Sequence, residues 1–110
     1  MMSDALRGHL DALILAVLEK EPLHGYAVME ALQVSSGGAL DLPTGSLYPA
    51  LRRLERAGLV ESEWSTVGGR RRRTYQLTSA GSRTLAAERT KWRDFSAMVD
   101  GVLRPGPATA

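Results

Sequence analysis

The feature that most constrains the fold is a change of hydrophobic period within one stretch of chain, residues 43 to 78. In its first part four apolar residues recur at i, i+3, i+4 and i+7, the spacing of one helix face: Leu47, Ala50, Leu51 and Leu54. Gly58 then stands where a helix-ending glycine belongs, and the residues from Val60 onward alternate or favour strands. The pattern predicts a short helix that leads directly into a β-hairpin.

Both predicted elements carry positive charge on their outer surface. Opposite the apolar stripe, the helix presents polar, small and cationic residues: Gly45, Pro49, Arg52, Arg53 and Arg56, with Ser46 and Tyr48 beside them. The strands are predicted at 60–65 and 73–77, with Gly68-Gly69 as the turn signal and four arginines at 70–73. A cationic helix beside a cationic β-ribbon suits a DNA duplex, with the helix in the major groove and the ribbon on the phosphates.

Two more helices are expected before this stretch. The first is capped by Ser3 or Asp4 and runs to about Glu19, and its core stripe is Leu10, Leu13, Ile14, Val17 and Leu18. A second, thinner stripe consists of Leu6, Ala12 and Leu15, with Gly8 and Asp11 beside it. Leu15 either widens the core contact or belongs to a second surface.

The connections between the first three helices leave alternative structures open. Pro22 breaks the first helix, His24-Gly25-Tyr26 opens a second helix that runs to about Ser35, and residues 39–42 form either an edge strand or an extended arm. The third helix begins at Thr44 or Ser46 and ends at Ala57. Pro49 favours a late start with Ser46 as the N-cap, or a bent first turn.

A long last helix is predicted from Ser79 to about Leu103, capped by Thr78. Its apolar residues form a narrow a/d seam of a kind that packs against a partner helix: Leu85, Trp92, Phe95, Val99 and Val102. The seam, together with Leu6, predicts a homodimer interface, and packing of the same seam on the first helix is compatible with it.

The element order is helix, helix, helix, strand, strand, helix, which predicts a mainly α (α+β) winged helix-turn-helix with a C-terminal dimerisation helix. The expected organisation is a DNA-binding domain over 1–78, the dimerisation helix over 79–103 in the same compact unit, and a disordered tail over 104–110.

Composition agrees with a DNA partner and argues against other classes. Twelve of the fourteen basic residues are arginine, whose planar fork matches phosphates and guanine edges. The chain has no cysteine, its two histidines lack ligand spacing, and no catalytic constellation is present, so no metal, cofactor or enzymatic activity is expected. Without an export signal or a membrane-length apolar run, a cytoplasmic, nucleoid-associated protein is expected.

Several motifs in order resemble the PadR-type transcriptional regulators, specifically the small subfamily with one long C-terminal helix. They are Leu-His-Gly-Tyr at 23–26, Gly-Ser-Leu-Tyr-Pro-Ala-Leu-Arg-Arg-Leu-Glu at 45–55, Gly-Leu-Val at 58–60, and Gly-Arg-Arg-Arg-Arg-Thr-Tyr-Gln-Leu-Thr-Ser-Ala-Gly at 69–81. The sequence departs from the family at Arg71, where many members carry proline, and this adds charge and flexibility to the wing.

The resemblance implies a dimeric repressor of its own or neighbouring genes that binds a roughly palindromic double-stranded operator. In some small members flat aromatic or multidrug-type ligands lodge at the dimer interface and stack on a tryptophan of the last helix, a place that Trp92 occupies here. The implied effector pocket consists of Gly8, Asp11, Ala12, Leu15, Trp92, Phe95 and Ser96.

The predicted DNA contacts come from the third helix and the wing: Thr44, Gly45, Ser46, Tyr48, Pro49, Arg52, Arg53, Arg70, Arg71, Arg72 and Arg73. Arg52 and Arg53 are either base readers or backbone clamps, and Arg73 is also placed to pair with Glu61 or Glu63 across the hairpin. Trp64 and Tyr75 fit packing better than a base-stacking platform.

Two alternative functions remain: a winged-helix scaffold that binds protein instead of DNA, and a regulator without a ligand.

Overall fold

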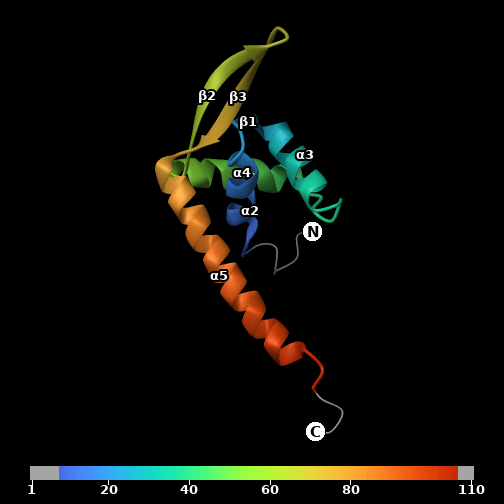
Figure 1. Cartoon of the computed structure of the whole chain (residues 1–110). Helices are drawn as coiled ribbons and strands as arrows, with labels where there is room; N and C mark the ends of the chain where they lie inside the picture. The colour runs from blue at the N-terminus through green and yellow to red at the C-terminus, as the bar shows by residue number, and fades with distance from the viewer. Residues whose placement is uncertain (1–7, 107–110) are drawn as a thin grey trace.

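The computed structural model describes residues 8–106 and contains three short helices, a three-stranded sheet and one long helix (Figure 1). The elements are α2 (Leu10–Leu18), β1 (Leu23–His24), α3 (Gly25–Ser35), α4 (Thr44–Arg56), β2 (Val60–Val67), β3 (Arg70–Leu77) and α5 (Ser79–Leu103). The predicted winged helix-turn-helix with a long C-terminal helix is confirmed.

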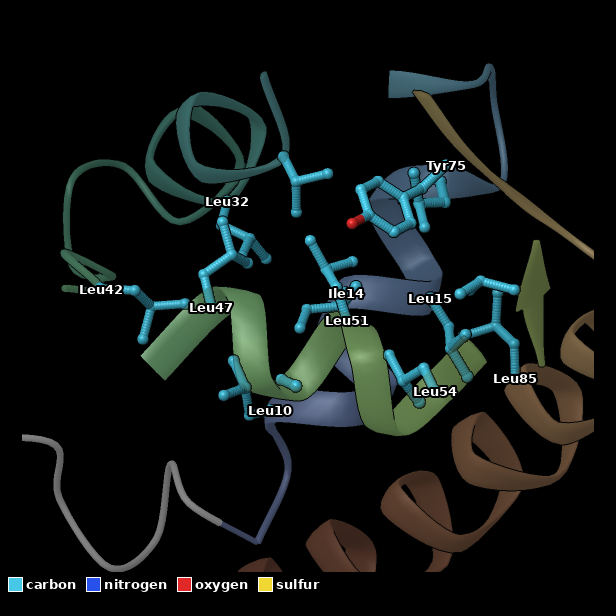
Figure 2. Packing of buried hydrophobic residues seen from close by; sticks show 14 residues of the cluster. Leu10, Ile14, Leu15, Leu32, Leu42, Leu47, Leu51, Leu54, Tyr75 and Leu85 are labelled. Atoms are coloured by element: carbon cyan, nitrogen blue, oxygen red, sulfur yellow. The ribbon is translucent and has the colours of Figure 1, made fainter. Parts of the chain in front are cut away.

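The core lies where α2, α3 and α4 meet, and Figure 2 shows its leucines converging on Ile14 and Leu51. All four residues of the predicted α4 stripe are buried, which confirms the helical period. On α2, Leu10, Ile14 and Leu18 are buried as expected, and Leu15 is only 1% exposed. Leu15 therefore widens the core contact and does not face a second surface.

The sheet has the strand order β1-β3-β2, and both pairings are antiparallel. Gly68 and Gly69 connect β2 to β3 with φ of +58° and +78°, backbone angles that glycine adopts without steric cost. Of the two alternatives for residues 39–42, the edge strand is wrong, because these residues belong to no strand. Leu23 and His24 supply the third strand by pairing with Tyr75 and Thr74, while Leu42 is a buried loop residue.

The structure fixes the starts of two helices, and for α4 it selects Thr44 from the two starts that the sequence allows. Helix α2 begins at Leu10, because Gly8 and His9 form a turn; its predicted start at residues 3–4 lies outside the described residues. Helix α4 begins at Thr44 because Ser46 and Leu47 donate their N–H groups to the carbonyl of Pro43, which makes Pro43 the N-cap and excludes Ser46 from that role. Pro49 thus lies inside the helix.

Helix α5 begins as predicted, since the hydroxyl of Thr78 accepts a hydrogen bond from the N–H of Gly81 at 3.0 Å. Its first turns join the core through Leu85, and Arg89 forms a two-bond ion pair with Glu19. Beyond that point the helix extends away from the body, as Figure 1 shows, and the described chain reaches 68 Å along its longest axis.

Candidate nucleic-acid interface

A groove of about 500 Å³ runs between helix α4 and the hairpin. Its lining combines cationic and aromatic side chains from both elements: Tyr48, Arg52, Glu55, Arg56, Trp64, Arg73 and Tyr75. Arg52 and Arg56 are exposed and lie one turn apart on α4, because residues i and i+4 share a helix face. The groove therefore presents guanidinium groups at an open surface, as recognition of a phosphate backbone requires.

A second hollow of about 480 Å³ continues from the groove toward the start of α3. It is lined by His24, Gly25, Tyr26, Tyr48, Trp64, Tyr75 and the four wing arginines at 70–73. The two hollows share Tyr48, Trp64, Arg73 and Tyr75, so Tyr48, Arg52 and the four wing arginines line adjoining hollows. Thr44, Gly45 and Pro49 are exposed on α4, whereas Ser46 is half-buried.

Tyr48 lies directly over Gly25. A Cβ added at Gly25 would stand 2.6 Å from the Tyr48 ring, so only glycine leaves room for the ring in this position. The glycine of the Leu-His-Gly-Tyr motif therefore makes room for the Tyr48 ring, which lines both hollows.

The wing arginines divide between the two faces of the hairpin, as alternation along a strand requires. Arg71 and Arg73 lie over the ring of Trp64. Arg72 lies on the other face, where its Nη1 is 2.8 Å from Nε2 of His24.

The predicted pairing of Arg73 with Glu61 or Glu63 is wrong. The hairpin register places Glu61 opposite Gln76 and Glu63 opposite Thr74. Arg73 instead donates to the hydroxyl of Ser62 and pairs with Glu55 of α4 at 3.5 Å. These contacts fasten the wing to the helix.

Arg53 faces away from the groove. Its guanidinium donates to the carboxylate of Asp11 in α2, and this hydrogen bond raises the pKa of Arg53. Arg53 and Arg52 are neighbours in sequence, but they point to different parts of the molecule.

The two aromatic residues of the hairpin have different environments. Tyr75 is buried in the core, and this burial raises the pKa of its hydroxyl. Trp64 is 55% exposed at the groove and packs across the hairpin against Arg71 and Arg73, so Tyr75 shows the expected packing in the core and Trp64 shows it between strands.

Among the residues of this surface that the predicted DNA contacts omit are His24, Tyr26, Arg56 and Trp64. Arg56 had a detectable signal, since it follows Arg52 by one helical turn. The other three reach the surface through the pairing of β1 with β3 and through the hairpin register, which are long-range features.

A different, mainly apolar hollow of about 480 Å³ lies between α2 and α5. Its lining is His9, Ala12, Leu13, Ala16, Leu85, Glu88, Arg89 and Trp92. The Trp92 ring meets His9 edge-on at 5.0 Å between centroids and lies 5.8 Å from Phe95. Of the predicted effector residues, Ala12 and Trp92 line this hollow, whereas Asp11 is bound to Arg53 and Leu15 is in the core.

The remaining predicted effector residues, Gly8, Phe95 and Ser96, do not line the hollow. Gly8 is exposed in the turn before α2. The hydroxyl of Ser96 donates a hydrogen bond to the carbonyl of Arg93 within α5.

The apolar seam of α5 is largely uncovered in the single chain. Trp92, Phe95 and Val102 are 53%, 52% and 76% exposed, and Val99 is half-buried. Leu85 is different, since it is 2% exposed and belongs to the core of its own chain. Leu6 lies outside the described residues.

Within residues 8–106, no cluster of three or more metal-binding side chains occurs. No helix in the same range has the length and apolar content needed to cross a membrane.

Three helices followed by a hairpin, with a cationic groove between the third helix and the hairpin, define a winged helix-turn-helix protein. The model of the PadR-like family of transcriptional regulators matches residues 14–87, so the chain belongs to that family and is not an enzyme. The sequence-based family assignment is confirmed.

Solved relatives support the assignment. A PadR family transcriptional regulator from Eggerthella lenta is 33% identical, with 94% of this chain and 88% of that chain covered and a TM-score of 0.80. A PadR-like regulator from Bacillus cereus is 27% identical over 94% of this chain and the whole of that chain, with a TM-score of 0.83. A transcriptional regulator from Mycobacterium tuberculosis is 44% identical over 57 residues, about half of each chain.

Proposed function

We propose that this regulator is a homodimeric repressor that binds a palindromic operator in double-stranded DNA near its own gene. The groove between α4 and the wing carries the proposal, because Arg52, Arg56 and Arg73 converge there with two exposed aromatic rings. In this arrangement α4 enters the major groove and the wing follows the adjacent phosphates. Such a protein acts on the chromosome, in the cytoplasm.

The uncovered seam of α5 supports the dimer. Trp92, Phe95 and Val102 are large apolar residues more than half exposed on one helix, and a second copy of the same seam would remove them from water. A two-fold dimer also places two α4 helices at a fixed separation, which matches half-sites about one helical turn apart.

The hollow beside Trp92 supports an effector. Its lining is mostly apolar, and Trp92 and His9 supply ring surfaces on which a flat aromatic molecule can stack. Because the hollow lies at the base of the dimerisation helix, a ligand there would change the separation of the two α4 helices and so weaken operator binding.

The test of DNA binding is titration of a labelled duplex from upstream of the gene, compared with a scrambled duplex, across a series of salt concentrations. A specific regulator prefers the upstream duplex. The logarithm of its binding constant should fall linearly with the logarithm of the salt concentration, with a slope of about 0.9 per neutralised phosphate. Absence of binding to either duplex at low salt would refute the proposal and favour a protein-binding scaffold.

The dimer is tested by sedimentation of Phe95→Asp, which places a charge in the seam and should yield monomers. Ala97→Asp is the matched control, because Ala97 is exposed on a different face of α5 and should leave the dimer intact. A Phe95→Asp protein that remained dimeric would exclude this seam as the interface.

The effector site is tested by titrating planar aromatic dyes and following Trp92 fluorescence in a Trp64→Phe background. Quenching that is lost in Ala12→Leu, which fills part of the hollow without adding a tryptophan, supports the site. Release of operator DNA by a dye that still acts on Trp92→Ala would contradict it.

A further inference from the structure

Two arginine side chains of the neighbouring strand lie over the exposed Trp64 ring. The guanidinium carbon of Arg71 is 4.9 Å from the ring centroid, and that of Arg73 is 5.5 Å away. Both distances lie within the ~6 Å at which a cation is attracted to the face of an aromatic ring.

This placement follows from the register of the hairpin. Trp64 pairs with Arg73, and Thr66 pairs with Arg71, so the ring and both arginines share one face. That face is the one turned toward α4, because Ser62, two residues before Trp64, donates to Glu55 at 2.6 Å.

The ring has a clear electrostatic effect here. Two guanidinium groups on one face of a strand repel each other, and the negative face of an indole offsets that repulsion. Arg73 has Ser62 and Glu55 as additional partners. For Arg71, the ring of Trp64 is the contact that the described part of the chain provides.

We infer that Trp64 is a positioning residue, which holds the guanidinium groups of Arg71 and Arg73 on the groove side of the wing for contact with DNA phosphates. The inference rests on the proposed function and adds a residue to it. Without the ring, Arg71 would sample solvent and Arg73 would keep only Ser62 and Glu55 as partners, so part of the cost of ordering these side chains would fall on the DNA complex.

The test compares Trp64→Leu, which keeps apolar bulk but removes the aromatic face, with Trp64→Phe, which keeps an aromatic face. Trp64→Leu should weaken binding to the upstream duplex about 5- to 30-fold, the loss expected for two exposed cation–π contacts. Trp64→Phe should restore most of the affinity. Equal losses in the two variants would overturn the inference.

A double-mutant cycle separates positioning from a general effect on the fold. In an Arg71→Ala/Arg73→Ala protein, Trp64→Leu should change affinity less than about twofold, since the arginines through which it acts are gone. An undiminished effect in that background would overturn the inference, as would wild-type affinity of Trp64→Leu alone.

Fluorescence provides a reading that needs no DNA. In a Trp92→Phe background Trp64 is the only tryptophan, and its emission should shift when Arg71 and Arg73 are replaced by alanine. An unchanged spectrum would refute the contact itself. Failure of the wild-type protein to bind any duplex would refute the proposed function and the inference together, an outcome distinct from a variant that binds normally.

Discussion

Arg53 of helix α4 donates hydrogen bonds from Nε and Nη2 to the carboxylate of Asp11 in α2. The sequence predicts Arg53 as a DNA contact and Asp11 as an effector contact, yet the two side chains bind each other. The ion pair connects α4, which lines the groove beside the wing, to α2, which lines the hollow beside Trp92. It therefore links the two helices that carry the two proposed sites.

The first prediction distinguishes the two adjacent arginines. Arg52→Ala should weaken operator binding by about 1–3 kcal/mol, because Arg52 lines the groove. Arg53→Ala should weaken it far less and reduce stability by no more than about 1 kcal/mol, since the side chains of its ion pair with Asp11 are 58% and 46% exposed. Duplex titration and denaturant unfolding of both variants measure the difference. Equal losses of affinity would show that Arg53 leaves Asp11 to contact DNA.

The second prediction concerns Gly25→Ala. The new methyl group would displace the Tyr48 ring, whose free end can swing outward at little cost in stability. Operator affinity should fall by about 0.5–1.5 kcal/mol, the contribution of one hydrogen bond, while the melting temperature changes little. In a Tyr48→Ala background the same substitution should cause no further loss of operator affinity, as measured by duplex titration. A further loss there would mean that Gly25 matters for another reason.

The third prediction compares two glycines of α5. A Cβ at Gly81 would overlap the carbonyl oxygen of Leu59, a backbone atom that cannot move freely, so Gly81→Ala should destabilise the protein by about 1–3 kcal/mol. Gly101→Ala is the control, because the space around Gly101 is open and alanine favours a helix by up to about 1 kcal/mol. Urea unfolding measures the change in the free energy of unfolding for both variants. A neutral Gly81→Ala would contradict the close approach of α5 to Leu59.

The fourth prediction is a pH dependence. Burial raises the pKa of Tyr75, so the folded chain holds the phenolic proton more tightly than the unfolded chain does. The resulting stability is fully present below the unfolded pKa of about 10 and is lost as pH rises toward the folded value.

Tyr75→Phe cannot ionise, and its melting temperature should therefore fall less steeply above pH about 10 than that of the wild-type protein. Thermal unfolding followed by far-ultraviolet circular dichroism measures this. If the melting temperatures of the two proteins fell in parallel above pH about 10, groups other than Tyr75 would dominate the loss of stability.

Much of the fold follows from the sequence alone. Four predicted features depend on residues only a few positions apart, and each appears in the structure. They are the stripe that ends at Leu54, the Gly68-Gly69 turn, the Thr78 cap and the length of α5. The family motifs are likewise local patterns, and they lead to the correct family. Local patterns suffice here because helix periodicity, caps and turns depend on near neighbours.

The tertiary structure decided which side chains meet. The pairing of Leu23 with Tyr75, the contact of Arg73 with Glu55 and the ion pair of Arg53 with Asp11 each join residues far apart in sequence. Such contacts depend on strand register and on the angles at which helices pack, and a one-residue change of register would move every side chain to the opposite face. For that reason the sequence predicts a cationic helix and wing, whereas only the folded chain assigns Trp64 to the groove and Arg53 to Asp11.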